Sequence, residues 1–293
     1  SKAVGTYISS VTRKRLYQNK LTGKTYPVKA ITEMGGKNAV IVTTNAELDE
    51  TVSGILYSAF GHAGQKCSAC SRVLVHNSLK EKLIERLKEA CSDLKVGESY
   101  RFDTTVNPVI SKEDQERLRQ SVIQASSEAR NFGGQVILDR SQEDLPGFCV
   151  GPVLIELPYE RAFDQQSFAK RELFGPVLHI VGFNTLDEAI KLFNSTDYAL
   201  TGGIFSQSQN DIDYLLTKLE SGNIYVNRTI TGARVAIEPF GGFKLSGTGP
   251  KAGGRHYILS LHQTLEGGND KAQAPVVYPT GEGSDYQFDL ARP

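Results

Sequence analysis

The chain has 293 residues, 39% of them hydrophobic, which is enough to bury a full core and to contribute to a second domain. Lys plus Arg and Asp plus Glu both number 33, so no net charge exists to attract nucleic acid or an anionic membrane surface. No apolar run approaches the roughly 18 residues of a membrane span, and the first ten residues lack the apolar stretch of a signal peptide. We therefore expect a soluble, cytoplasmic protein with neither a nucleic-acid partner nor an intrinsic membrane span.

Short β-favouring runs alternate along the chain with amphipathic helices, which predicts an α/β domain whose sheet is covered on both faces. The predicted strands are Ala39–Thr43, Ser71–His76, Gln135–Asp139, Cys149–Leu157, Val177–Phe183, Gly202–Ser206 and Asn223–Asn227. Between the first two strands one helical face is apolar, and it consists of Leu48, Val52, Ile55, Leu56 and Ala59. The C-terminal end of this helix should point toward Cys67.

Two further helices follow. The first begins at the candidate caps Asn77 and Ser78 and carries apolar residues at four-residue spacing up to Cys91, which we expect in the core. The second begins at the cap Ser111 and ends at the pair Gly133-Gly134.

The C-terminal part of the chain has a different character. The β-favouring segment Tyr257–Gln263 predicts a strand at a sheet edge or at a contact between subunits. Beyond about Leu265 the sequence is rich in Gly, Pro, Asp and Ser without periodicity, which predicts an extended tail.

The four cysteines, Cys67, Cys70, Cys91 and Cys149, are too few and too scattered for a disulfide framework, and we expect free thiols. Cys67 and Cys70 form a C-x-x-C pattern that would suit a redox pair or half of a zinc site. No second pair exists, however, and the histidines show no ligand spacing. We therefore predict no metal.

Cys67 lies in GHAGQKCSAC, a glycine-containing segment with a cation, Lys66, directly before it. A thiol attacks as thiolate, so a nucleophilic cysteine needs an environment that lowers its pKa, such as backbone N–H groups or a cation. A small buried residue is an equally open interpretation. Glu33 precedes two glycines that permit close approach of another group, although a solvated loop carboxylate is the commoner explanation of such a pattern.

Several motifs occur together in order: ITEMGGKNAVIV, GQKCSA, RELFGPV, GNIYVN and EPFGGFKLSGTG, with Glu33 and Cys67 separated by 34 positions. From residue 1 to about residue 265 the chain thereby resembles the aldehyde dehydrogenase superfamily. The resemblance implies an aldehyde-dehydrogenase-like α/β fold: a catalytic domain with part of a Rossmann-like NAD-binding domain. It also implies that Cys67 is the nucleophile, that its backbone N–H is an oxyanion donor, and that Glu33 activates the hydrolytic water.

The same resemblance places Glu172 at the nicotinamide ribose and Phe174 beside it. SKAVG is similar to the end of the family's Gly-Ser-x-x-Val-Gly turn, which implies that Ser1 lies at the cofactor pyrophosphate, where a helix begins. The family implies NAD as cofactor, with NADP left open. Its sequences carry a further N-terminal half upstream of this turn, so we expect this chain to be a C-terminal fragment that oxidises aldehydes poorly alone.

The segment NRTITGARVAIEPFGGFKLSGTGPKAGG is similar to the substrate loop of glutamate-semialdehyde dehydrogenases, including the module in bifunctional proline utilization A proteins. The resemblance implies that backbone N–H groups of Gly232 and Ala233, with the hydroxyl of Ser68, bind the substrate carboxylate. Phe240 would form an apolar wall for the methylenes. The implied activity is NAD-dependent oxidation of L-glutamate γ-semialdehyde to L-glutamate in proline catabolism.

The resemblance also divides the chain. It implies the end of an NAD-binding domain (1–33), a catalytic domain (34–235), the substrate-loop continuation and return to the NAD-binding domain (236–256), an oligomerisation strand (257–266) and an extended tail (267–293). The implied partners are a small-molecule aldehyde, further copies of the chain in a homo-oligomer, and a proline dehydrogenase module fused in the natural chain.

Three alternatives remain open at this point. The first is a noncatalytic domain of the same fold, the second is an acyl-transferring or esterase-like cysteine enzyme, and the third is an aldehyde dehydrogenase for another aldehyde. The presence of both Cys67 and Glu33 argues against the first alternative. The Glu172 and Phe174 motif argues against the second.

Overall fold

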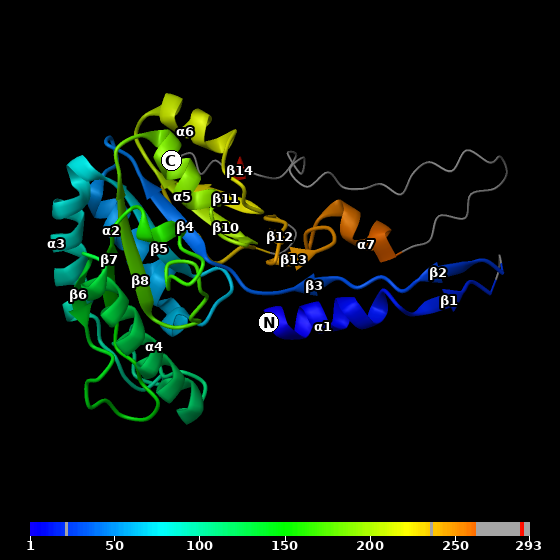
Figure 1. Cartoon of the computed structure of the whole chain (residues 1–293), viewed down its shortest axis with the longest axis horizontal. Coiled ribbons are helices and arrows are strands. Elements are labelled where there is room, and N and C mark those ends of the chain that lie inside the picture. Colours follow the sequence, from blue (N-terminus) through cyan, green and yellow to red (C-terminus); the bar gives the residue numbers. More distant parts are fainter. Residues whose placement is uncertain (21–22, 235–236, 262–287, 290–293) are drawn as a thin grey trace.

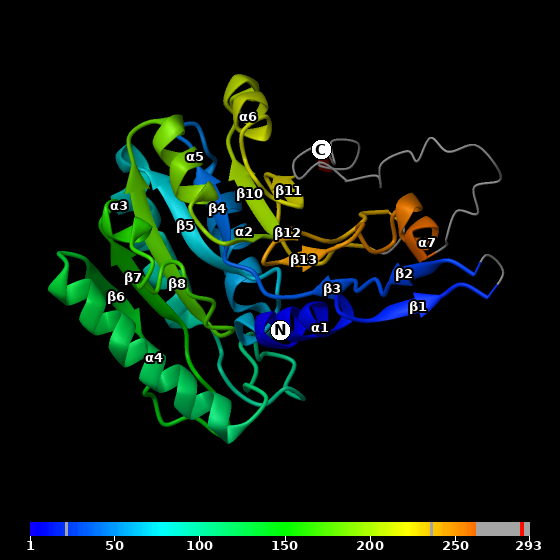
Figure 2. The ribbon, with the colours of Figure 1, turned by 45° about the vertical axis from the view of Figure 1, so that its right-hand side comes forward.

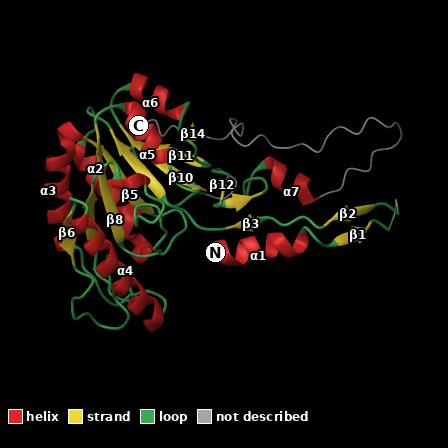
Figure 3. Cartoon of the chain, viewed as in Figure 1, coloured by secondary structure: helices red, strands yellow, loops and turns green. Residues whose placement is uncertain are grey.

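The computed structural model describes residues 1–20, 23–234, 237–261 and 288–289. At its centre lies one eight-stranded sheet in the order β14-β11-β10-β4-β5-β8-β7-β6 (Figure 3). The strands are β4 (Asn38–Val42), β5 (Cys70–His76), β6 (Gln135–Asp139), β7 (Val153–Leu157), β8 (Val177–Phe183), β10 (Thr201–Phe205), β11 (Asn223–Val226) and β14 (Phe288–Asp289). Neighbouring strands are parallel except β6 and β7, which are antiparallel.

Helices cover both faces of this sheet: α2 (Leu48–Phe60), α3 (Asn77–Asp93), α4 (Lys112–Asn131), α5 (Leu186–Asn194) and α6 (Gln209–Leu216). On β10 the Gly202 position faces Phe193 of α5, whereas Phe205 contacts Gly54 of α2. Side chains alternate along a strand, so residues three apart point to opposite faces. Helices α2 and α5 therefore lie on opposite sides of the sheet (Figure 1). The predicted α/β fold, with helices on both sheet faces, is confirmed.

An outer arm projects from one side of the sheet in both Figure 1 and Figure 2. It contains α1 (Lys2–Thr12), β1 (Leu16–Gln18), β2 (Thr25–Pro27), β3 (Thr32–Glu33), β13 (Gly247–Thr248) and α7 (Arg255–Leu261). Strands β3 and β13 pair antiparallel, with Glu33 opposite Gly247, so the beginning of the chain and the segment after residue 246 are joined. A second short pair, β9 (Tyr198–Ala199) and β12 (Phe243–Lys244), ties that segment back to the sheet.

The strands and helices predicted up to residue 227 are confirmed within a few residues, with two local corrections. Strand β7 begins at Val153 rather than Cys149, because Pro152 has no N–H to donate to a neighbouring strand. The N-cap of α3 is His76, whose ring nitrogen accepts the N–H of Ser78 at 3.2 Å, so neither Asn77 nor Ser78 is the cap.

The strand predicted at Tyr257–Gln263 is wrong for the residues that the structure describes. Residues 255–261 form α7, and the Tyr257 N–H donates to the Gly254 carbonyl at 3.0 Å. A helix satisfies its backbone groups within the segment, whereas an edge strand leaves them in need of a neighbour. The remainder of the predicted oligomerisation strand and most of the predicted tail lie outside the described residues. Within that tail, β14 pairs with β11. The domain boundaries stay a prediction.

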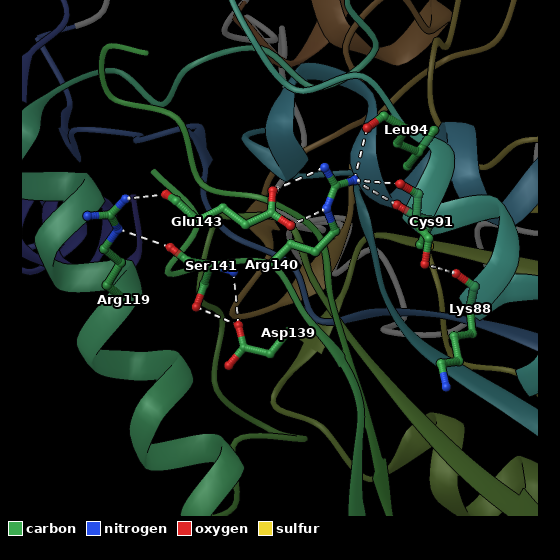
Figure 4. A network of polar contacts seen from close by, with 9 residues as sticks. Lys88, Cys91, Leu94, Arg119, Asp139, Arg140, Ser141 and Glu143 are labelled. Atoms are coloured by element: carbon green, nitrogen blue, oxygen red, sulfur yellow. Dashed lines mark hydrogen bonds and ion pairs between the residues drawn. The ribbon is translucent and has the colours of Figure 1, made fainter. Parts of the chain in front are cut away.

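Arg140 closes the C-terminal end of α3 (Figure 4). Its guanidinium donates to the carbonyls of Cys91, Ser92 and Leu94 at 3.0, 3.2 and 2.9 Å, and it pairs with Glu143 at 2.8 Å. The last carbonyls of a helix have no partner within the helix, and this one side chain satisfies two of them, those of Cys91 and Ser92, as well as the carbonyl of the C-cap Leu94. Cys91 is fully buried there, which confirms its predicted place in the core.

All four cysteines are free, as predicted. Among the described residues, no three His, Cys, Asp or Glu side chains gather as a set of metal ligands. In the same part of the chain, no helix is both long enough and apolar enough to cross a membrane.

Candidate active site

A cavity of about 880 Å³ lies beside the loops that precede β4, β5 and β8. Its wall includes eight of the nine residues that the sequence predicts for the site: Ser1, Cys67, Ser68, Glu172, Phe174, Gly232, Ala233 and Phe240. Positions more than 200 residues apart in the sequence thus share one hollow. The ninth predicted residue, Glu33, adjoins the wall through its neighbour Met34.

The segment before Cys67 is strongly bent. His62 and Ala63 have φ angles of 59° and 53°, so both lie in the left-handed region that non-glycine residues seldom adopt. The chain then turns through Lys66, whose carbonyl accepts the N–H of Ala69 at 3.0 Å. This path leaves Cys67 partly exposed in the cavity wall, whereas Cys70 is 2% exposed at the start of β5.

The electrostatics at Cys67 differ from the expected ones. Burial raises the pKa of its thiol above the ordinary value, and the carboxylates of Glu33 and Glu172 raise it further. The backbone N–H groups of Ser68 and of Cys67 itself act in the opposite direction and lower it. The N–H groups that we expected are therefore present, but the net shift is upward because desolvation is the larger effect. At Cys70, complete burial raises the thiol pKa to about 12.

Glu33 lies in β3, at the junction of the outer arm and the sheet. Although the residue as a whole is exposed, burial of its carboxyl end raises its pKa to about 7. That end is close to the backbone of two glycines: a Cβ added at Gly241 or Gly247 would lie 3.3 or 3.7 Å from Glu33 Oε1. A carboxyl group with a pKa near 7 can accept a proton from water at neutral pH.

Glu172 is held by the glycine pair after Glu33. Its Oε1 accepts the N–H of Gly36 at 2.9 Å. A Cβ at Gly35 would lie 2.0 Å from Glu172 Oε2, so only glycine allows this contact. Burial raises the pKa of Glu172. Phe174, two residues on, has a φ of 56° and is 44% exposed, so its ring is presented to the cavity at some backbone cost.

Ser1 is the N-cap of α1, and its hydroxyl accepts the N–H of Val4 at 3.4 Å. The positive end of the α1 dipole thus lies at the cavity wall, an arrangement that suits an anionic group.

The predicted carboxylate site lies on the same wall. Gly232 has a φ of 85°, and no atom lies within 4 Å of the place where its Cβ would be. Ser68 is 8% exposed. Phe240 is fixed by two backbone hydrogen bonds to Ala252, of 3.0 and 2.7 Å. Gly232, Ala233, Ser68 and Phe240 are thus brought together as predicted, and their roles remain predictions.

The sequence analysis missed other residues of the wall: Met34, Gly35, Gln65, Glu238, Ala252 and Gly253. Glu238 is 6% exposed and accepts hydrogen bonds from Arg228 and Arg234. Glu238 begins the motif EPFGGFKLSGTG, two residues before Phe240, and this position could have indicated that it belongs to the site. Gln65 carried the same signal, because it stands in the motif GQKCSA two residues before Cys67, but its contacts with Pro108 and Ile110 span more than 40 positions and left no pattern in the sequence.

The aldehyde dehydrogenase family model matches residues 2–265. The chain belongs to the aldehyde dehydrogenase family. It is 34% identical over 256 residues to 1-pyrroline-5-carboxylate dehydrogenase of Staphylococcus haemolyticus, covering 86% of this chain and 48% of that protein. It is 36% identical to 1-pyrroline-5-carboxylate dehydrogenase 1 of Halalkalibacterium halodurans, covering 85% and 47% of the two chains. The chain thus spans about half the length of the curated relatives that it matches.

Solved structures agree with this assignment. Proline utilization A from Bdellovibrio bacteriovorus is similar with a TM-score of 0.76 at 38% identity, over 87% of this chain and 25% of that one. A 1-pyrroline-5-carboxylate dehydrogenase from Thermus, solved with bound NAD, is similar with a TM-score of 0.77 at 32% identity, over 88% and 47%.

Proposed function

We propose that the protein containing this chain oxidises L-glutamate γ-semialdehyde, formed from 1-pyrroline-5-carboxylate, to L-glutamate with NAD. The observation that carries the proposal is the cavity that joins Cys67 to both the predicted cofactor residues and the predicted carboxylate site. Relatives with the name 1-pyrroline-5-carboxylate dehydrogenase support the same substrate.

The Cys67 thiolate adds to the aldehyde carbon, and the aldehyde oxygen becomes an oxyanion. The backbone N–H groups of Cys67 and Ser68, which act on the thiolate, would donate to this oxygen. Preorganised N–H groups at a developing negative charge lower the barrier because they do not reorganise during the reaction. Loss of hydride from the adduct leaves an acyl thioester on Cys67.

Glu33 completes the reaction. It accepts a proton from water while the water oxygen attacks the thioester carbon; the bond between that carbon and the Cys67 sulfur then breaks, which releases the carboxylic acid and frees the Cys67 thiolate. The pKa of about 7 for Glu33 suits this task, because the carboxylate is populated at neutral pH and is still a useful base.

The residues present fit a nicotinamide cofactor. Glu172 is partly buried, oriented by the Gly36 N–H, and suited to accept hydrogen bonds from ribose hydroxyls. Phe174 offers a ring at the cavity wall, and the N-terminus of α1 at Ser1 suits a pyrophosphate. When bound, the nicotinamide would accept the hydride of the adduct. We propose NAD because a relative carries NAD in its structure.

The carboxylate of the substrate would lie against Gly232, Ala233 and Ser68. A turn with N–H groups directed outward binds an anion without a cation, and the open side of Gly232 leaves room for it. Phe240 would contact the methylenes.

Three further expectations belong to this proposal. The protein is a homo-oligomer, the domain division of the sequence analysis holds apart from the strand at residue 257, and the natural chain is fused to a proline dehydrogenase module. The similarity to proline utilization A supports the fusion.

The substrate assignment is tested by kcat/KM for glutamate semialdehyde and for pentanal in the full-length protein and in Ser68→Ala. We expect the wild type to prefer the semialdehyde by roughly a hundredfold or more, because a site built for a polar group rejects analogues that lack it. Ser68→Ala should lower only the semialdehyde value, by about tenfold. Phe240→Ala is the matched control and should lower both values. Equal wild-type values for the two substrates would refute the assignment, and thiol acylation without NADH would indicate an acyl-transferring enzyme.

A further inference from the structure

The loop of Cys67 is tied to the sheet by one buried amide. Asn38, the first residue of β4, donates from Nδ2 to the carbonyls of Cys67 and Ala69 at 2.7 and 2.8 Å. Its Oδ1 accepts the N–H of Thr201, the first residue of β10, at 3.0 Å. Only one orientation of the amide satisfies all three contacts, because two partners are acceptors and the third is a donor. The side chain is 3% exposed, so these bonds do not compete with bulk water.

Thr201 makes a second tie to the same loop. Its hydroxyl donates to the carbonyl of Ser68 at 3.0 Å, and the residue is 2% exposed. Together with the turn in which Ala69 donates to Lys66, all four successive carbonyls from residue 66 to residue 69 are fixed.

Fixing a carbonyl also fixes an N–H. The peptide unit is planar and trans, so the N–H of the next residue points opposite to the carbonyl. The tie from Asn38 to the Cys67 carbonyl therefore points the Ser68 N–H away from Asn38, and the Lys66 turn fixes the direction of the Cys67 N–H. These two groups are the ones that lower the pKa of the Cys67 thiol.

The local backbone is built to permit this contact. A Cβ at Gly36 would lie 2.4 Å from the Cys67 carbonyl oxygen and 2.8 Å from Asn38 Oδ1. The register between β4 and β5 shifts between Asn38 and Ala39, which places Asn38 opposite Cys70.

We propose that Asn38 and Thr201 are positioning residues, which hold the carbonyls of residues 67–69 so that the N–H groups of Cys67 and Ser68 stabilise the thiolate and the oxyanion. This proposal rests on the proposed function for its catalytic meaning. The charged groups that act on the same thiol are Glu33 and Glu172, and neither contacts Asn38 or Thr201 through a hydrogen bond in the described residues.

The test is the rate of alkylation of Cys67 by iodoacetamide against pH in the full-length protein, with Cys67→Ala giving the background. This reaction needs neither aldehyde nor cofactor, so its outcome is separate from that of the proposed function. Asn38→Ala and Thr201→Val should move the profile up by about one pH unit, which means about tenfold slower alkylation at pH 7. Thr201→Ser keeps the hydroxyl and should therefore show the wild-type profile. If Asn38→Ala does not fold, Thr201→Val alone tests the proposal.

Asn194→Ala is the matched control. The amide of Asn194, like that of Asn38, both donates and accepts. It donates to the carbonyl of Lys218 at 2.9 Å and accepts the N–H of Glu220 at 2.8 Å, but it holds a different loop. It should leave the alkylation profile unchanged. The proposal is overturned if Asn38→Ala and Thr201→Val lower only the melting temperature and keep the wild-type profile, or if Asn194→Ala moves the profile equally.

Discussion

The sheet and the outer arm differ in how completely each covers its own apolar side chains. Val40, Leu74 and Leu154 of the sheet have no exposed surface. In the arm, Tyr7 and Leu16 are 69% and 66% exposed, and Leu259 of α7 is 63% exposed. Burial of apolar surface drives folding, so the sheet carries the stability of this chain and the arm adds little. The predicted chemistry follows the same division: Cys67 is anchored by the sheet, and Glu33 stands where the arm joins it.

The largest effect should come from loss of the Cys67 thiol, with Cys70 at the start of β5 as the comparison. Cys67→Ala in the full-length protein should lower aldehyde oxidation by several orders of magnitude, because the reaction loses its nucleophile. Cys70→Ala should keep most of the activity, since the Cys70 thiol is buried and its pKa of about 12 keeps it protonated. Initial rates of NADH formation measure both. If instead Cys70→Ala is the inactive variant, the nucleophile is misassigned.

Substitution of Glu33 tests the junction between the outer arm and the sheet. Glu33→Gln should lower turnover by about a hundredfold to ten-thousandfold, the usual range for loss of a general base. In the wild type the deacylation rate should rise with pH up to about 7, because Glu33 is protonated below its pKa and cannot accept a proton from water. Glu33→Gln should lose this limb of the pH–rate profile. A limb near pH 7 that persists in the variant would assign it to another group.

The smallest effects should come from substitutions that compare the stability of the sheet with that of the outer arm. Leu74→Ala opens a cavity in the sheet and should lower the free energy of unfolding by about 2–5 kcal/mol. Leu259→Ala in α7 should change it by less than about 0.5 kcal/mol, since its side chain is mostly exposed. Chemical denaturation of this chain with each substitution measures the pair. Comparable losses would show that the arm contributes to the core.

The sequence was most informative where a pattern is local. Apolar periodicity located α2 and α4, and largely apolar runs with several β-branched residues located β4 and β8, because parallel strands buried on both faces leave that pattern. Ordered motifs located Cys67 and Glu33. At Tyr257 the same β-favouring composition was misleading, since helix formation satisfied the backbone locally.

The contacts that hold the site could not be predicted. Asn38 and Thr201 are 163 positions apart, and nothing in their neighbours indicates that both bind the loop of Cys67. The net shift of the Cys67 pKa was also beyond the sequence, because it depends on how far burial exceeds the effect of two N–H groups. The motifs indicated most residues of the cavity wall but not its place at the amino ends of parallel strands, since ligands in open α/β sheets more often lie at the carboxyl ends.

The most direct test of the account is to trap the acyl enzyme. Full-length Glu33→Gln is mixed with glutamate semialdehyde and NAD, quenched in acid, and digested for peptide mass spectrometry. We predict an acyl adduct on the peptide that contains Cys67, located at its sulfur by fragmentation, together with one equivalent of NADH per active site. An adduct at Cys70, or NADH formation with no adduct on either cysteine, would contradict the mechanism.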